Sequence, residues 1–391
     1  MRLRKLAPTI RFCLVVLCSA ATLAASGKTQ SSSVPAPTGA SQVGTLWQRL
    51  VNVSRNDPFL ENGAKRELMV RFWYPAAQGT CTPANYASPK VWAYLSQIAG
   101  FPLPKIKTNS CLHSAVAPGI HPVIVFSPGF TGMLTDSTFL FEELASRGYV
   151  VASIAHTHES TAVEFPDGRL SASAFGSYLA PQTLRADIDS LALVRSARLA
   201  DVKFVLDELW RLDTTLGGPF HNKLDLTRIG VMGHSLGGEV ALSILQHESR
   251  VRAAVWIDGV ISDESATGTA KPVLLLAAGR EQWNQNECRL WSNLRGIRVA
   301  VNLRGAEHLT PSDAVWLGRA IPGMAVAGGA AGSARTIAAI RNHVTAFFDS
   351  TLRDRPFNPL LTGLTLDNRA VTVTTATQRL CHELAEKGEP Q

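Results

Sequence analysis

The motif Gly233-His234-Ser235-Leu236-Gly237 constrains the fold of this chain more than any other feature of the sequence. An apolar run at 229–232 precedes the motif, and residues 236–247 follow it with the pattern of a helix. A serine at the centre of G-x-S-x-G, between a strand and a helix, is typical of a nucleophile elbow, a sharp turn that places the hydroxyl above a sheet and at a helix N-terminus. The sequence therefore predicts Ser235 as a catalytic nucleophile; the alternative is a plain strand-to-helix turn.

Short apolar runs alternate with helical segments along most of the chain. The runs lie at 121–127, 149–155, 229–232, 253–257, 273–277 and 297–303, and the helical segments at about 136–147, 181–212, 236–247 and 333–352. Such runs are typical of strands buried on both faces, and their alternation with helices indicates right-handed βαβ units. We expect an α/β fold with a mostly parallel central sheet, helices on both faces, and two further strands at about 45–53 and 67–74.

The composition indicates a globular protein, because 46% of the 391 residues are hydrophobic and 18% are charged. We interpret residues 43–391 as one domain with two additions. The first is an irregular insertion at about 75–120, with many prolines and one short helix near 89–99. The second is a C-terminal extension, about 353–391, which we expect to be extended and then weakly helical near 378–386.

The N-terminus has the features of an export signal. Residues 1–26 combine a basic start, an apolar segment and small residues at 24–26, which predicts a signal peptide and a periplasmic or secreted protein. The alternative is an uncleaved anchor. Residues 27–42, rich in Ser, Pro, Ala and Gly, are predicted to be a flexible leader. Loss of the signal lowers the net charge from +7 to +3 and leaves no dense basic run, so we expect no nucleic-acid partner.

Four cysteines follow the predicted signal, Cys81, Cys111, Cys288 and Cys381. An even number in an exported protein favours disulfides. We favour Cys81–Cys111 and Cys288–Cys381, because each pair would tie an irregular segment; the alternative is four unrelated thiols. No C-x-x-C spacing is present, which argues against a zinc knuckle.

A serine nucleophile needs a base, and the base needs an orienting acid, in the chain order Ser, acid, His. His308 lies in a loop just past the run that ends near 303, where a base is required at the carboxyl edge of the sheet. The order of residues leaves Asp258 and Glu281 about equal as the acid, since each follows a predicted strand. Asp263 and Asp313 are more remote choices.

An oxyanion hole requires two N–H donors, each worth roughly 3 kcal/mol of transition-state stabilisation. Leu236, directly after the nucleophile, is predicted to supply one. The loop at 127–132, which contains Pro128-Gly129, is predicted to supply the second from Phe130; the alternative is a simple Pro-Gly turn.

Several polar and aromatic residues lie near the same predicted edge. His156, His158 and Glu159 follow the run at 149–155, but a metal site there lacks a clear third ligand, so we expect no metal and no cofactor.

We expect His156 and Trp283 to contact the substrate. Trp291 and Trp316 are further candidates for an acyl site, although most tryptophans belong to the core. The Gly/Ala-rich stretch 320–334 is interpreted as a lid or a loose connection.

The chain resembles the platelet-activating-factor acetylhydrolase family of α/β hydrolases, of the plasma and type II kind. The motifs that carry the resemblance, over about 66–350, are Arg71-Phe-Trp-Tyr-Pro75, Pro122-Val-Ile-Val-Phe-Ser-Pro-Gly129, Leu144-Ala-Ser-Arg-Gly-Tyr-Val-Val151, the elbow, Val255-Trp-Ile-Asp258 and Gly305-Ala-Glu-His308. The resemblance implies the α/β-hydrolase fold, Asp258 as the acid, and Phe130 and Leu236 as oxyanion donors. The family's first oxyanion loop often has Ser-His-Gly where this chain has Ser127-Pro128-Gly129, which puts the substrate in question more than the chemistry.

The resemblance also implies hydrolysis of short acyl groups from the sn-2 position of phospholipids without calcium. The expected partner is therefore a small-molecule or lipid ester, with transient contact to a lipid surface. One alternative is a cutinase-like or lipase-like esterase for longer or polymeric esters. The other is a non-catalytic binding protein of the same fold, because fold alone does not determine function.

Overall fold

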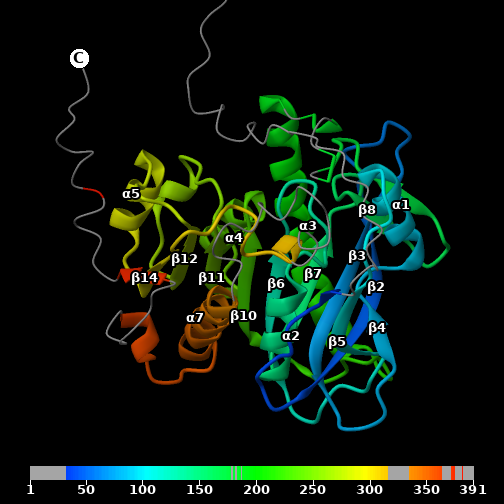
Figure 1. Cartoon of the computed structure of the whole chain (residues 1–391), viewed down its shortest axis with the longest axis horizontal. Coiled ribbons are helices and arrows are strands. Elements are labelled where there is room, and N and C mark those ends of the chain that lie inside the picture. The colour runs from blue at the N-terminus through cyan, green and yellow to red at the C-terminus, as the bar shows by residue number, and fades with distance from the viewer. Residues whose placement is uncertain are drawn as a thin grey trace, which may run out of the picture.

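The computed structural model describes residues 32–177, 179–180, 183–185, 187–315, 334–362, 371–374 and 381. One large sheet organises them, with the strand order β1-β5-β2-β3-β7-β6-β10-β11-β12-β13-β14 (Figure 1). The strands are β1 (Ser32–Ser33), β2 (Gln42–Asn56), β3 (Lys65–Ala76), β4 (Pro83–Asn85, paired with β5), β5 (Ile106–Leu112), β6 (His121–Ser127), β7 (Val150–Ala155), β10 (Leu224–His234), β11 (Val251–Ile257), β12 (Val273–Ala278), β13 (Arg298–Leu303) and β14 (Val371–Thr374). A small separate hairpin consists of β8 (Ala162–Glu164) and β9 (Leu170–Ala172).

The centre of the sheet is parallel, as the sequence predicts. Strands β7, β6, β10, β11, β12 and β13 pair in parallel, whereas β3 is antiparallel to both of its neighbours and β14 is antiparallel to β13. Parallel strands direct their carboxyl ends to one edge, so the loops after β6, β10, β11 and β13 meet there. Those loops carry the predicted oxyanion loop, nucleophile, acid and base.

Helices cover both faces of the sheet, in agreement with the prediction. Helices α1 (Pro89–Ala99), α2 (Thr138–Ser146) and α7 (Ala334–Leu352) contribute to the core on one face, and α3 (Ile188–Thr214), α4 (Leu236–His247) and α5 (Gln285–Asn293) to the core on the other. Strand β6 shows why its sequence is nearly all apolar: Val123 and Val125 pack on the α3–α4 face, and Ile124 and Phe126 on the α2–α7 face. The two cores thus enclose the central strands from both faces.

Helix α3 begins later than the sequence indicates. The sequence predicts a helix from about 181, but the side chain of Asp187 accepts a hydrogen bond from Ser190 N and caps the helix there. A carboxylate at the N-cap satisfies one of the free N–H groups of the first turn and suits the helix dipole. The expected boundary is therefore wrong by about seven residues, whereas α4 begins and ends where the sequence predicts.

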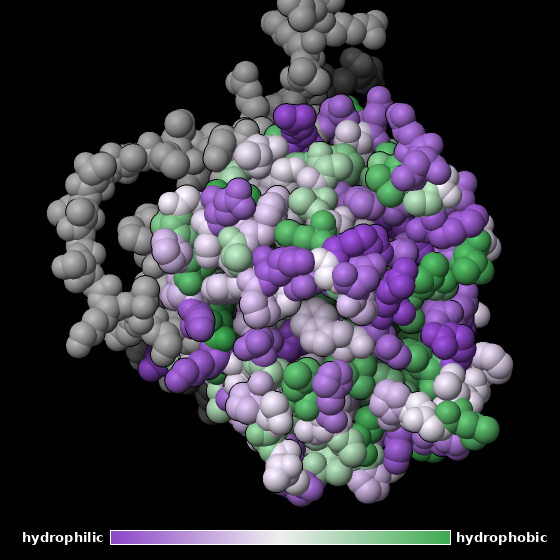
Figure 2. Space-filling view, turned by 90° about the vertical axis from the view of Figure 1, so that its right-hand side faces the viewer, coloured by the Kyte–Doolittle hydropathy of each residue, from purple (hydrophilic) through white to green (hydrophobic). Residues whose placement is uncertain are grey.

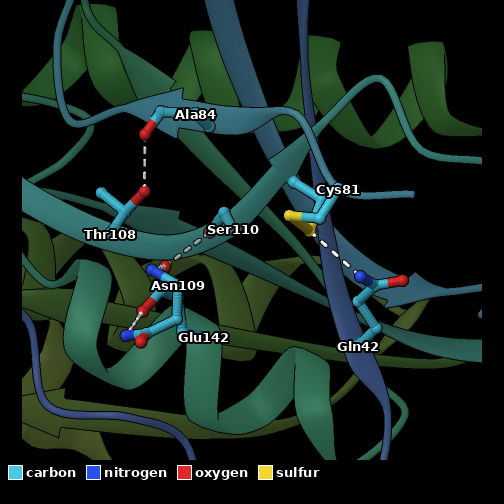
Figure 3. The surroundings of a disulfide bond; sticks show 8 residues. Gln42, Cys81, Ala84, Thr108, Asn109, Ser110 and Glu142 are labelled. Atoms are coloured by element: carbon cyan, nitrogen blue, oxygen red, sulfur yellow. Dashed lines mark hydrogen bonds between the residues drawn. A yellow bond between two sulfur atoms is a disulfide. The ribbon is translucent and has the colours of Figure 1, made fainter. Parts of the chain in front are cut away.

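The segment 75–120 is more regular than an irregular insertion. It contains the expected helix α1 together with β5, which pairs in parallel with β2 and extends the main sheet. A disulfide joins Cys81 to Cys111 on β5. Beside it, the buried carboxylate of Glu142 on α2 accepts from Asn109 N at 2.7 Å and from Ser110 Oγ at 2.6 Å (Figure 3). The disulfide and this carboxylate fix the segment to the domain.

The predicted flexible leader is packed from residue 33 onward. Strand β1 pairs with β5, and Val34 is buried. Thr38 N donates to Glu143 Oε2 at 2.8 Å, and Arg341 donates to the carbonyl oxygen of Ala36 at 2.8 Å. Composition indicates flexibility here, but these backbone groups find partners on β5, α2 and α7, so this part of the prediction is wrong.

The C-terminal extension contributes an edge strand and a disulfide. Strand β14 pairs with β13, and Cys381 is bonded to Cys288 on α5. Both disulfide pairings are those favoured from the sequence. The predicted signal peptide, Trp316, most of the Gly/Ala-rich stretch and all of the predicted helix at 378–386 except Cys381 lie outside the described residues.

Among the helices that the structure describes, each is too short or too polar to cross a bilayer.

Figure 2 shows the face that is on the right in Figure 1, with α1 and β8. Hydrophilic and hydrophobic side chains are interspersed over that face.

Candidate active site

Ser235 occupies a strained turn between β10 and α4. Its backbone has φ 55° and ψ −122°, in the region that favours glycine, and its N–H donates to Ile257 O at 2.9 Å. A Cβ on Gly233 would collide with the carbonyl of Gly237, and one on Gly237 would collide with the carbonyl of Ser127. The glycines of the motif are therefore required for the close approach of β10, α4 and the loop after β6.

Asp258 and His308 are hydrogen-bonded at the same edge of the sheet. Asp258 follows β11 directly, with φ 41°, and its Oδ2 lies 2.7 Å from His308 Nδ1. A carboxylate only accepts, so Nδ1 carries a proton; in the neutral ring Nε2 then has the lone pair. The side chain of His308 is 49% exposed and that of Asp258 only 6%. The Nδ1 side of the imidazole is thus held by Asp258, while about half of the side chain is exposed to solvent.

The second oxygen of Asp258 has its own partners. Its Oδ1 accepts from Ala278 N at 3.0 Å and from Arg280 Nε at 2.9 Å. Burial raises the pKa of Asp258, but the hydrogen bond from His308 and the charge of Arg280 outweigh burial and hold this pKa at about 2. Asp258 is consequently a carboxylate at neutral pH.

The other three carboxylates that the sequence left as candidates for the acid are not bonded to His308. Glu281 is exposed, and the side chain of Asp263 is 88% exposed. Asp313 is fully buried and accepts from Thr138 N at 2.8 Å at the start of α2. Asp258 is the one of the four that the structure joins to His308.

His234, which sequence analysis did not single out, supports the base loop. Its ring lies 4.7 Å from the ring of His308, centroid to centroid, and its Nε2 lies 2.8 Å from the carbonyl oxygen of His308. Burial, and then the charge of His308, lower the pKa of His234 to about 3. A neutral His234 therefore donates from Nε2 to the His308 backbone. Its position directly before the nucleophile is the one sequence signal that could have indicated this role.

The loop after β6 lies against the nucleophile. A Cβ built on Gly129 would stand 3.4 Å from the Cβ of Ser235 and 3.4 Å from His234 Nδ1. Within the described ranges, neither Phe130 N–H nor Leu236 N–H has a protein acceptor. Leu236 is the first residue of α4, where N–H groups lack intrahelical partners. Both predicted donors are thus available.

His156 is not placed to contact a substrate, contrary to the expectation from sequence. It is completely buried, with Nδ1 2.9 Å from Asp201 Oδ2 and Nε2 3.0 Å from Ser127 Oγ. Burial, and then the charge of Arg198, lower its pKa to about 4. The sequence correctly indicates the edge of the sheet on which His156 lies, but tertiary packing encloses the ring.

Trp283 belongs to the core on the α5 side of the sheet. It is 7% exposed and packs edge-on against Trp291, with ring centroids 5.7 Å apart. It also borders a narrow space beside Arg280, behind the acid's strand. The core alternative therefore describes both tryptophans.

A cavity of about 230 Å³ lies farther along the carboxyl edge. Its walls come from α1, the β8 segment, the start of β3 and residues 133–135, which follow Phe130 in the chain; they include Val91, Met69, Met133 and Phe165. The cavity is almost entirely apolar, and Ser235 is not among its lining residues. In the described ranges, His, Cys, Asp and Glu side chains form no group of three that could hold a metal ion.

Comparison with known proteins places this chain in a family. The model of the family described as platelet-activating factor acetylhydrolase, isoform II, matches residues 26–168 and 200–358. The chain belongs to this family. The family membership expected from the sequence motifs is thereby confirmed, and the matched segments contain Ser235, Asp258 and His308.

Individual relatives differ in the substrates that they are named for. A probable 1-alkyl-2-acetylglycerophosphocholine esterase of Arthroderma benhamiae is 25% identical over 177 residues, 44% of this chain and 41% of that protein. Cutinase est1 of Thermobifida alba is 25% identical over 155 residues, 40% of each chain. The matched segments therefore span less than half the length of these two relatives.

A solved structure is similar over a longer range. A ferulic acid esterase from Streptomyces cinnamoneus has a TM-score of 0.75 and 34% identity, covering 88% of this chain and 100% of that one. This likeness confirms the α/β-hydrolase fold predicted from the sequence.

Proposed function

We propose that this protein is a carboxylic ester hydrolase in which Ser235, His308 and Asp258 form the catalytic triad. The observation that carries the proposal is the 2.7 Å contact between Asp258 and His308 Nδ1 at the edge of the sheet where Ser235 occupies a strained elbow. Two free backbone N–H groups, of Phe130 and Leu236, complete the set of groups that acyl transfer requires.

In the acylation step, His308 Nε2 accepts the proton of Ser235 as the hydroxyl oxygen attacks the ester carbonyl. The carbonyl oxygen becomes an oxyanion, to which Phe130 N–H and Leu236 N–H donate. Asp258 keeps the proton on Nδ1 and stabilises the imidazolium. His308 then gives its proton to the leaving alkoxide, and the acyl group remains on Ser235.

Deacylation repeats these steps with water as the nucleophile. His308 takes a proton from water, the hydroxide oxygen adds to the acyl carbon, and Ser235 leaves with the proton held by His308. No metal or redox group takes part in this sequence of steps.

For the substrate we propose short-chain acyl esters, such as the sn-2 acyl group of platelet-activating-factor-like phospholipids. The family match supports this choice, as does the relative from Arthroderma benhamiae. A second candidate is a cutinase-like esterase for longer or polymeric esters, favoured by the similarity to cutinase est1. The two disulfides support the further proposal that the signal peptide exports the enzyme, since disulfides persist in oxidising compartments.

The acyl-chain dependence of hydrolysis tests the substrate proposal. Phosphatidylcholines that differ only in the sn-2 group, acetyl or long-chain, are offered to the purified enzyme, with Ser235→Ala as the blank. We expect a strong preference for acetyl. Equal or faster hydrolysis of long chains would reject the short-chain assignment and favour the cutinase-like one, while leaving the triad intact.

A further inference from the structure

Arg198 on α3 holds the peptide group that carries one predicted oxyanion donor. Its Nη2 donates to the carbonyl oxygen of Gly129 at 2.8 Å, and its Nη1 donates to that of Pro128. The Gly129 carbonyl and the Phe130 N–H belong to one peptide, and in a planar trans peptide they point in opposite directions. A guanidinium that draws the carbonyl toward α3 therefore turns the Phe130 N–H away from α3.

The next peptide is held in the opposite sense. Thr131 has φ 56°, a left-handed conformation, and its N–H donates to Glu159 Oε1 at 2.6 Å. The other oxygen of Glu159 accepts from Arg198 Nη2 at 2.6 Å. The Arg198–Glu159 ion pair thus fixes the Gly129 carbonyl and the Thr131 N–H, the groups on the two sides of Phe130. The N–H of Gly132 adds a bond of 2.8 Å to the Gly129 carbonyl, so the turn itself contributes to this orientation.

This ion pair is entirely buried, since Arg198, Glu159 and Thr131 are all 0% exposed. Buried charge pairs are weak sources of stability, because desolvation offsets much of their attraction. What such a pair does provide is direction: a planar guanidinium with several donors accepts few alternative arrangements of the carbonyls around it.

A buried chain of hydrogen bonds supports Arg198 from behind. Arg198 Nη1 donates to Ser127 Oγ at 3.1 Å, Ser127 lies 3.0 Å from His156 Nε2, and His156 Nδ1 lies 2.9 Å from Asp201. Asp201 also pairs with Arg66 at 2.7 Å. Ser127, His156 and Asp201 have the residue types of a catalytic triad, but Ser127 is only 3% exposed, and one lone pair of its oxygen accepts from Arg198. These hydrogen bonds therefore support the oxyanion loop and do not face a substrate.

From these contacts we infer that Arg198, with Glu159, is a positioning residue that orients the Phe130 N–H toward the oxyanion. The inference rests on the proposed ester hydrolysis at Ser235. Without the guanidinium, only the Gly132 N–H would hold the Gly129 carbonyl. The 129–130 peptide could then rotate, and a carbonyl oxygen turned toward the site would repel the oxyanion. The effect belongs to the transition state, because only there is the negative charge developed.

The test compares Arg198→Met with Arg341→Met. Arg341 is a matched control, because it is also buried, at 5% exposed, and also donates to backbone carbonyls, those of Phe139, Ala36 and Pro35. Arg341 lies on α7, and the carbonyls that it binds lie on the leader and on α2, outside the oxyanion loop. A soluble short-chain ester gives kcat and KM for each variant. A trifluoromethyl ketone, which adds to the serine as a tetrahedral oxyanion, gives an inhibition constant.

For Arg198→Met we expect kcat to fall by about 10²-fold, as when one oxyanion donor is lost, with KM changed by less than about threefold. The inhibition constant of the ketone should rise in parallel with the loss of kcat. For Arg341→Met we expect kcat within about threefold of the parent enzyme. Arg198→Lys, which keeps the charge but not the fork, should give an intermediate kcat and serves if the methionine variant does not fold.

Two failures are distinguishable. If the parent enzyme does not hydrolyse esters, or Ser235→Ala retains activity, the proposed function fails. If Ser235→Ala is inactive but Arg198→Met and Arg198→Lys match Arg341→Met in kcat and in the inhibition constant, the role of Arg198 is wrong. A change confined to KM would also contradict it.

Discussion

At the scale of single residues, the two oxygens of Asp258 have separate tasks. Oδ2 accepts from His308 and sets the tautomer of the base, whereas Oδ1 is bound by Ala278 N and Arg280 and cannot turn away. The low pKa of about 2 that follows, against the opposing effect of burial, keeps the acid charged throughout the neutral range. A charged, immobile carboxylate is what the imidazolium of the proposed mechanism requires.

Asp258→Asn is expected to lower kcat by about 10⁴-fold, because an amide that donates to Nδ1 favours the wrong tautomer. Glu281→Gln is the matched control, since Glu281 is exposed and was the competing acid on chain order alone. Steady-state kinetics on a soluble ester measures both variants. A loss of activity in Glu281→Gln, with Asp258→Asn nearly unaffected, would move the acid to Glu281.

The sequence makes definite residue-level predictions where a motif or chain order is informative. Ser235 and His308 follow from the elbow and from the position of a loop after a strand. Asp258 and Glu281 could not be separated by order, because both follow strands, and only the resemblance to a family favoured Asp258. Arg198 was not identified, because its contacts with the oxyanion loop span some seventy positions and leave no local pattern.

At the scale of elements, the loop that carries His308 is hydrogen-bonded through Asp313 to the start of α2. Asp313, five positions after His308, accepts from Thr138 N at 2.8 Å and from Phe139 N at 3.3 Å. Burial raises the pKa of Asp313 to about 7, and these two N–H groups only partly oppose the shift. The loop that carries the base is therefore attached through a carboxyl that titrates near neutral pH.

This attachment predicts a pH dependence of stability. Between the unfolded pKa of 3.8 and the folded value of about 7, the folded state holds a proton that the unfolded state has lost. The stabilisation is complete below 3.8 and disappears as the pH rises through 7, with a slope of up to about 1.4 kcal/mol per pH unit. Asp313→Asn cannot titrate, so its unfolding free energy should lack this decline. Urea denaturation of both proteins between pH 4 and 8 measures the difference, and parallel curves would refute the assignment.

Element boundaries follow from the sequence where capping is unambiguous. Helix α4 starts directly after the elbow, as expected, but the start of α3 is set by the Asp187 cap, which the prediction of a helix from about 181 did not take into account. The leader and the segment 75–120 look irregular in composition. They are ordered by partners on β5 and α2, which a single-sequence pattern does not contain.

At the scale of the whole molecule, the two disulfides lie at different ends of the sheet. Cys81–Cys111 closes 30 positions within the added strands, and Cys288–Cys381 closes 93 positions between α5 and the C-terminal segment. In the chain-entropy description, the longer loop stabilises the fold more, at about 4–5 kcal/mol against roughly 3–4 kcal/mol for the shorter one.

Replacement of Cys288 and Cys381 together by Ser should therefore lower the unfolding free energy by a few kcal/mol and leave kcat at 25 °C nearly unchanged. The double Cys81/Cys111 serine variant is the comparison, with a smaller expected loss. Urea denaturation and ester hydrolysis are measured on the same preparations. A large loss of kcat in a variant that remains folded would show that the C-terminal segment contributes to the site.

The central claim is that Ser235 is the nucleophile of an ester hydrolase, and its reaction with a fluorophosphonate tests this claim most directly. Intact-mass analysis is made of the parent enzyme and of Ser235→Ala, and hydrolysis of a short-chain ester is measured before and after labelling. We expect one label on the parent enzyme, complete loss of hydrolysis with labelling, and neither label nor activity, to within about 10⁻⁶ of the parent rate, in Ser235→Ala. A parent enzyme that is not labelled, or an alanine variant that still hydrolyses the ester, would contradict the account.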